Sequence, residues 1–194
     1  MSSDLSVINE ALIRLGATPL ASLEDGSAQA LVAASTYETC KHSLLADHPW
    51  HFALREVALA RLSLPDEERF YSGYQYAYQL PVVMLRALGL RDGDYFQIAS
   101  DQLLTNSREA RLVYIHPALE SVWPAYFRRL VVLETAAAFA LALTESAQRA
   151  DMFYREAARM APRARAIDSQ QTPPHIYNLM RIYARRRGNP LTQP

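Results

Sequence analysis

Cysteine and long apolar runs are both scarce in this sequence, and each scarcity excludes a class of protein. The single cysteine, Cys40, rules out an intramolecular disulfide, and no Cys/His ligand spacing surrounds it. The longest apolar run, residues 130–143, is interrupted by Glu134 and Thr135 and is shorter than the roughly 20 residues that a membrane span needs. We therefore expect no membrane contact and a buried core helix at 130–143. The N-terminus lacks a basic stretch followed by an apolar run, so we expect no signal peptide.

Motifs that carry catalysis or bind metals are also missing. The sequence has no HExxH, no glycine-rich phosphate loop and no G-x-S-x-G elbow. His48 and His51 are three residues apart, but Pro49 separates them, so we expect them not to share a helix face. Asp92 and Asp94 flank Gly93 in a pattern that favours an exposed turn over acid–base chemistry. We expect no catalytic residues, no cofactor and no metal, and hence no enzyme.

Lysine is almost absent, and the charges are unevenly distributed along a chain of zero net charge. Only Lys41 is a lysine among 20 basic residues. Residues 1–70 hold five basic and ten acidic side chains, whereas residues 146–194 hold nine basic and three acidic ones. This polarity suits head-to-tail packing between copies, or a basic end that meets an acidic partner. A merely solvated basic face is the alternative.

Apolar periodicity predicts four helices. Leu5, Ile8, Leu12 and Leu15 share one face of the first, at about 4–15, which Gly16 ends. Ser27 is the expected N-cap of the second, which ends near His48. Pro124 opens the third, which is apolar almost all round and hence the most buried. The fourth, at about 146–167, contains Pro162, which should kink it.

The middle of the chain changes to a period of two. Tyr74, Tyr76 and Tyr78 alternate with polar or small residues, as in a strand with one apolar face. Further strands are expected near 95–99, 103–104 and 110–114, and a turn at 65–68, while residues 50–64 fit either helix or strand. The expected fold is α+β and mainly α. It consists of an antiparallel bundle of about four helices (1–64 and 124–168), an inserted small antiparallel β-sheet (65–123) and an extended C-terminal tail (169–194).

The tail follows a Pro-Pro break and carries an apolar stripe at helical spacing. Such a stripe at a chain end usually marks a partner site, so we expect docking on another protein. The alternatives are that the tail folds back onto its own bundle, or that its arginines bind nucleic acid. The residues expected to dock are Ile176, Tyr177, Leu179, Met180, Tyr183, Arg185, Arg186 and Arg187.

Tyrosines and arginines elsewhere suggest a second contact surface. Tyrosines of a strand can stack on nucleic-acid bases, but such binding also needs basic side chains that attract the phosphates. No basic residue lies between Ser72 and Leu80, so that attraction is missing here. Tyrosine is favoured at protein contacts because it is rigid and amphipathic. We expect a subunit or tail interface formed by Tyr74, Tyr76, Tyr78, Arg155, Arg159 and Arg163.

An ordered set of segments resembles a known family. In chain order these are residues 7–20, 22–28, Tyr37 and Leu44-Leu45 in the helix that follows, His48-Pro49-Trp50-His51-Phe52-Ala53, Tyr78-Gln79-Leu80-Pro81 with Leu85-Arg86, Leu103-Leu104-Thr105-Asn106 and the Ala-rich helix pair 124–167. Together they resemble the tail tubular protein A and head–tail adaptor family of tailed phages. The likeness spans most of residues 5–168. Val83 departs from it, because such proteins often carry an acidic residue there, and the tail beyond Ser169 is not covered.

The resemblance implies a structural protein of the virion. It implies a helical bundle with an inserted sheet, assembled as a ring, commonly of twelve copies, that docks on the portal protein above and on a tail or nozzle protein below. DNA would pass through the channel without being read. Before assembly the free subunit would be a monomer in the host cytoplasm. The alternative reading is a small DNA-binding or genome-packaging module that uses Arg149, Arg155, Arg159, Arg163 and the arginine-rich tail.

Overall fold

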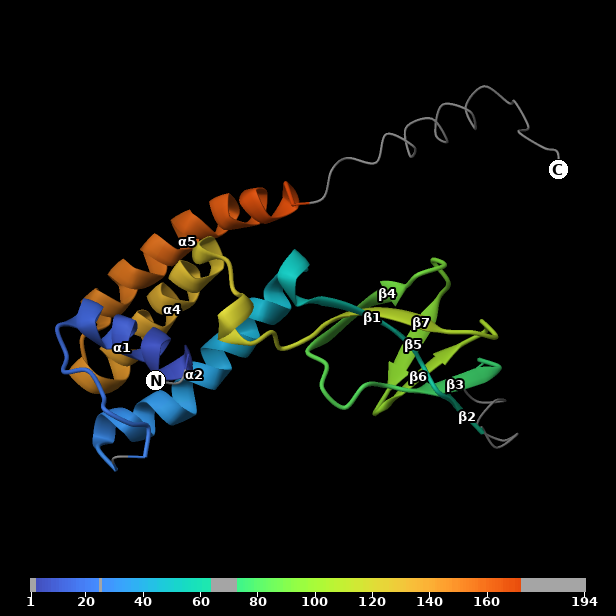
Figure 1. Ribbon diagram of the computed structural model, residues 1–194, viewed down its shortest axis with the longest axis horizontal. Coiled ribbons are helices and arrows are strands. Elements are labelled where there is room, and N and C mark those ends of the chain that lie inside the picture. Colours follow the sequence, from blue (N-terminus) through green and yellow to red (C-terminus); the bar gives the residue numbers. More distant parts are fainter. Residues whose placement is uncertain (1–2, 25, 64–72, 172–194) are drawn as a thin grey trace, which may run out of the picture.

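The computed structural model describes residues 3–24, 26–63 and 73–171. In this part of the chain 51% of the residues are helical and 18% lie in strands, which confirms the α+β class. The helices gather at one end of an elongated molecule and the strands at the other (Figure 1). The tail residues predicted to dock, and the turn predicted at 65–68, lie outside the described residues. No described helix is both long enough and apolar enough to cross a bilayer.

The described residues form four α-helices, α1 (Ser3–Leu15), α2 (Ala28–Asp47), α4 (Ala125–Thr144) and α5 (Ala147–Ser169). Two of them begin at serine caps, because the Ser27 hydroxyl accepts the Ala30 N–H and the Ser146 hydroxyl accepts the Arg149 N–H. Helix α1 ends where Gly16 takes a φ of +75°, a conformation that glycine adopts without strain. The predicted starts and ends of the helices are therefore met within a few residues.

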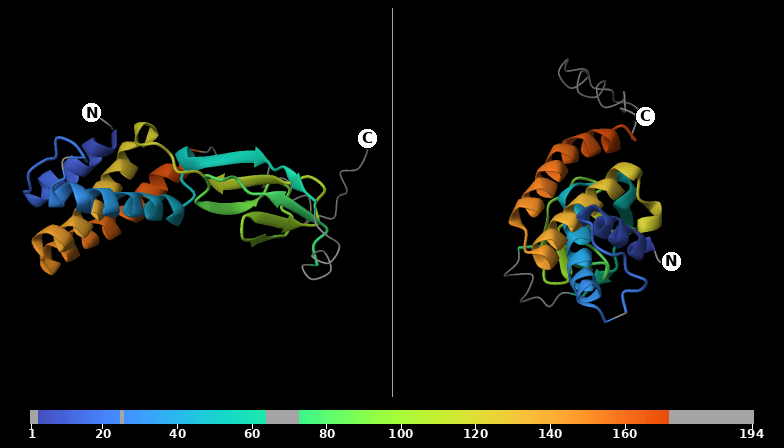
Figure 2. Two further views of the ribbon diagram at one scale, coloured as in Figure 1. Left: turned by 90° about the horizontal axis from the view of Figure 1, so that it is seen from below. Right: turned by 90° about the vertical axis from the view of Figure 1, so that its left-hand side faces the viewer.

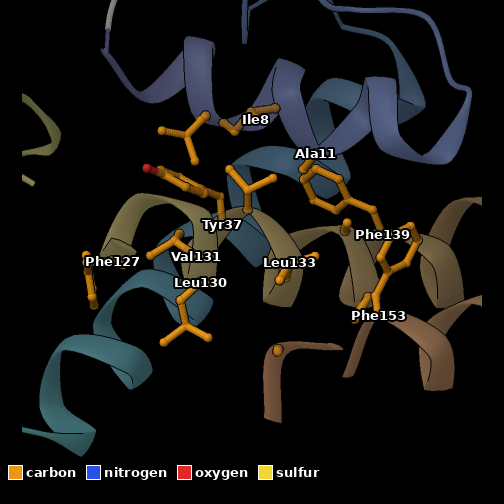
Figure 3. Packing of buried hydrophobic residues seen from close by; sticks show 14 of the residues in the cluster. Ile8, Ala11, Tyr37, Phe127, Leu130, Val131, Leu133, Phe139 and Phe153 are labelled. Atoms are coloured by element: carbon orange, nitrogen blue, oxygen red, sulfur yellow. The ribbon is translucent and has the colours of Figure 1, made fainter. Parts of the chain in front are cut away.

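Helix α4 is the centre of the bundle. It packs against α1, α2 and α5. Buried side chains on one side of α4 face α1, and those on the opposite side face α5 (Figure 3). This explains why its sequence is apolar almost all round. Arg128 near its start reaches Ser6 and Glu10 of α1, whereas Arg129 reaches Glu156 of α5.

The strands form two small antiparallel sheets, not the single sheet predicted. One has the order β1 (Leu54–Ala58), β7 (Arg111–Ile115), β4 (Arg86–Leu90). The other has the order β2 (Arg61–Leu62), β3 (Tyr76–Gln79), β6 (Gln102–Thr105), β5 (Phe96–Ala99). Leu103 and Leu112, one from each sheet, belong to one shared core.

The sheet region begins at Leu54, so the boundary predicted after residue 64 is wrong. Strand β1 pairs with β7, with Leu54 opposite Ile115 and Ala58 opposite Arg111. A pairing across this separation in sequence leaves no local signal, which is why residues 50–64 fitted either helix or strand. They form a short 3-10 turn, η1 (His51–Ala53), followed by β1 and β2.

Trp50 forms the joint between helices and strands. Its side chain is 1% exposed, its ring meets Phe127 of α4 edge-on at 5.0 Å between centroids, and its indole N–H donates to the Leu44 carbonyl. A large aromatic side chain buried in this way fixes the direction in which the chain leaves α2. The left view of Figure 2 shows the strands at one end of the bundle, and the right view shows α5 along one side of it.

Candidate functional site

The tyrosine strand lies mostly inside its own subunit. Tyr76 and Tyr78 of β3 share the face that packs into the core between the sheets, as the period of two predicts. Tyr74 is partly buried against a smaller cluster, and Arg61 lies over the ring of Tyr76 at 4.2 Å. Tyr74 and Tyr76 keep some exposed surface, and their role at an interface stays a prediction.

Tyr78 is not an interface residue, and its prediction as one is corrected. Its side chain is 2% exposed, and its hydroxyl donates to the Ser107 carbonyl at 2.8 Å. The alternation identified the apolar face of β3 but could not reveal that the β1–β7–β4 sheet covers this face. Tyr78 is a core residue of the sheets.

The arginines predicted on the fourth helix are exposed on α5. Arg155 pairs with Asp151 one turn earlier, and Arg159 donates from Nε to the Arg155 carbonyl. Among the described residues neither Arg159 nor Arg163 has a carboxylate partner. Arg149 is exposed as well and donates to the Leu15 carbonyl of α1. The face of α5 that points away from α4 is therefore strongly basic.

Arg159 and Arg163 border a groove between the start of α4 and the length of α5 from Met152 to Ile167. This basic groove has a volume of about 720 Å³. Met152, Met160 and Ile167 supply apolar surface to it. Arg129 also lines it and is paired with Glu156 at 3.3 Å. Guanidinium groups beside the exposed Met152 and the partly buried Met160 suit an amphipathic protein surface that carries carboxylates.

A second depression, the Glu134 pocket, opens on the other side of α5 and was not anticipated. Its volume is about 400 Å³, and its lining includes Cys40, Leu44 and Asp47 of α2, Glu134 of α4 and Tyr154 of α5. Glu134 is partly buried and has neither an ion pair nor a hydrogen bond among the described residues. Burial, and then the charge of Asp47, raises the pKa of the Glu134 carboxyl.

Asp168 is the centre of a buried polar cluster that the sequence did not reveal. Its carboxylate is fully buried near the end of α5 and accepts the Tyr126 hydroxyl at 2.7 Å and the His51 backbone N–H at 3.1 Å. The Nδ1 atom of His51 lies at 2.9 Å and Nε2 of His48 at 3.8 Å. The two histidines thus meet at one carboxylate although they share no helix face.

The Asp168 cluster acts as a structural tie. Burial, and then the hydrogen bond to Asp168, raises the pKa of Tyr126, so its hydroxyl remains a donor at neutral pH. Burial lowers the pKa of His48 in spite of the nearby carboxylate. The cluster joins the end of α5 to η1, at the joint between the helices and the sheets.

A second polar cluster surrounds Glu120, which is 6% exposed. Tyr37 donates to its Oε1 atom at 3.1 Å and the Lys41 ammonium at 3.0 Å. Burial alone would lower the pKa of Lys41, but its hydrogen bonds to Glu38 and Glu120 raise it. Oxygens of Asp4, Glu38 and Glu120 lie close enough together to hold a cation. The ammonium of Lys41 already supplies that positive charge, so the group fits a buried ion-pair network better than a metal site.

The chain matches no protein-family model, and none of the curated proteins compared with it matches either.

Proposed function

We propose that this chain is a structural head-to-tail adaptor of a tailed phage and not an enzyme. In this proposal its copies form a ring that joins the portal protein to the tail or nozzle protein and lines the DNA channel. The ring, commonly of twelve copies in the family that the chain resembles, would stand at the head–tail junction of the virion. Before assembly the subunit would be free in the host cytoplasm.

The basic groove on α5 is the observation that carries this proposal. Met152 is exposed there, and Arg159 and Arg163 have no carboxylate partner among the described residues, so the groove is suited to protein contacts and does not resemble a closed substrate pocket. The two-part shape adds support, because the two ends of an elongated subunit can contact different neighbours (Figure 1). Residues 48–53, one of the segments that resemble the adaptor family, form the joint between these two ends, which fits a rigid connector.

The C-terminal tail is assigned to portal docking. Ile176, Leu179, Met180 and Tyr183 repeat at three and four residues, which suits the anchoring of a helix in a groove. Arg185, Arg186 and Arg187 follow and would meet acidic side chains on the portal.

Binding to purified portal protein from the same genome tests this assignment. Size-exclusion chromatography with light scattering should show the full chain bound to the portal and a chain that lacks residues 170–194 unbound. Leu179→Asp combined with Tyr183→Asp should weaken binding at any salt concentration. Changing the three terminal arginines to serine should weaken it chiefly at low salt. Full portal binding by the truncated chain would refute the assignment of the tail to the portal interface. Failure of the full chain to bind the portal would refute the adaptor proposal.

A DNA-binding module is the second candidate, because Arg149, Arg155, Arg159 and Arg163 are all exposed on α5. It predicts affinity for duplex DNA that falls steeply as salt rises. The adaptor proposal predicts no shift of a 30-base-pair duplex at 50 mM salt. A shift that disappears in Arg159→Ser and Arg163→Ser variants would favour the DNA-binding module.

A further inference from the structure

Helix α5 presents two different flanks to solvent on either side of its buried seam. Ala157 lies on the seam that packs on α4. At 100° per residue, Arg163 lies about 120° around the helix from Ala157 in one direction and Tyr154 about 60° in the other. The basic groove therefore lies on one flank and the Glu134 pocket on the opposite one.

The Glu134 pocket is built to receive a cation. Its carboxylate is unpaired among the described residues, while neighbouring Asp47 is engaged by Arg165. Leu44 adds apolar surface and Tyr154 an aromatic ring, on which a guanidinium plane can stack. An isolated subunit is destabilised by this half-buried charge, because burial raises the pKa of Glu134. A guanidinium from outside would remove that cost.

The basic groove supplies what the pocket lacks. Arg159 and Arg163 have no carboxylate partner among the described residues, and they stand beside Met152 and Met160. Each flank thus offers one sign of charge and some apolar surface. Because the two flanks differ and lie on opposite sides of one helix, a contact between them joins copies head to tail and leaves both end copies able to add another.

We propose that one copy of this chain seats its basic groove against the Glu134 pocket of the next, with Arg163 donating to the Glu134 carboxylate. This rests on the proposed function, in which copies form a ring, and it names the surfaces that meet in that ring. Other occupants fit less well. The arginine-rich tail would be repelled by the groove, and the apolar floor of the groove suits a protein better than a phosphate backbone.

Cross-linking through the native cysteine tests the contact directly. Cys40 lines the Glu134 pocket and is the only cysteine of the chain, so Met152→Cys, in the basic groove, adds one reactive partner on the opposite flank and leaves Arg163 in place. The full-length variant is mixed with portal and treated with a short bismaleimide. We expect a ladder of covalent multimers on a denaturing gel. Arg86→Cys on strand β4, also exposed, is the matched control and should give no ladder beyond the unsubstituted chain.

The control and charge variants decide between outcomes. Glu134→Arg and Arg163→Glu should each weaken assembly about tenfold or more, and the double variant should recover most of it because every contact regains opposite charges. Assembly on the portal without a ladder, or without rescue by the double variant, would overturn this contact and leave the adaptor intact. If the ladder disappears when residues 172–194 are deleted while assembly persists, then the C-terminal tail occupies the Glu134 pocket. That result would also overturn the proposed contact. If the chain does not assemble with the portal at all, the adaptor proposal itself is refuted.

Discussion

Replacing Asp168 by alanine should destabilise the whole chain. The carboxylate is 0% exposed and accepts the Tyr126 hydroxyl and the His51 N–H, so its loss leaves two donors without their partner. Removing one partner from a buried charged network costs about 3–5 kcal/mol. Because Tyr126 and His51 are both partly exposed, water can reach them and the lower end applies, about 3 kcal/mol.

Thermal and urea unfolding followed by circular dichroism measure this loss. For a chain of this length about 1 kcal/mol corresponds to 2–4 °C, so the midpoint of Asp168→Ala should fall by about 6–12 °C. Asp151→Ala is the matched control on the same helix. Its side chain is 57% exposed and, within the described part of the chain, pairs with Arg155 alone, so the cost should stay below about 0.5 kcal/mol.

A double-mutant cycle with Tyr126→Phe isolates the hydrogen bond between the two side chains. The coupling free energy should be about 1 kcal/mol or more, because the two groups are in direct contact. If Asp168→Ala melts within about 2 °C of the unchanged chain, then the cluster does not tie α5 to the joint, and the reasoning is refuted.

Three further substitutions have expected outcomes. Lys41→Met should lower the free energy of unfolding in urea by about 3 kcal/mol, because Glu120 then stays buried without the Lys41 ammonium. Adding Glu120→Gln should recover most of that loss. Tyr78→Phe removes a hydroxyl that donates to Ser107 and should cost about 1 kcal/mol while portal affinity stays unchanged, since the side chain is internal. Glu134→Gln should raise the melting temperature at pH 7.5. A carboxyl whose pKa is raised by folding destabilises the fold above that pKa, so the gain should disappear as the pH falls towards about 4.

The helices could be predicted because their signals are local. Leu5, Ile8, Leu12 and Leu15 repeat at three and four residues, and all four are buried. Ser27 caps α2 through its own side chain, three residues from the N–H that it accepts. The run at 130–143 was expected to be a core helix, and α4 is the central helix of the bundle.

The sheets were harder to predict, because the partner of a strand lies far away in sequence. Strand β4 was missed; it contains Gly89 and a register shift beside it, which blur the alternation. Strand β1 was left open because β7, more than fifty residues later, decides its conformation. Tyr78 was assigned to an interface because the period of two marks an apolar face without saying what covers it.

The polar clusters and pockets were beyond sequence reasoning for the same reason. Asp168 lies 117 residues from His51, and no spacing rule relates an acid near the end of one helix to a turn before a strand. Glu134 was visible as an interruption in an apolar run. Its isolation became clear only when α2 and α5 were placed beside it.

Electron cryomicroscopy of the full chain mixed with purified portal would image the proposed assembly itself. We expect a closed ring of subunits against the portal, with the Arg163 flank of each α5 facing the Glu134 flank of its neighbour. Subunits that stay single beside the portal, or that bind duplex DNA in its place, would contradict it.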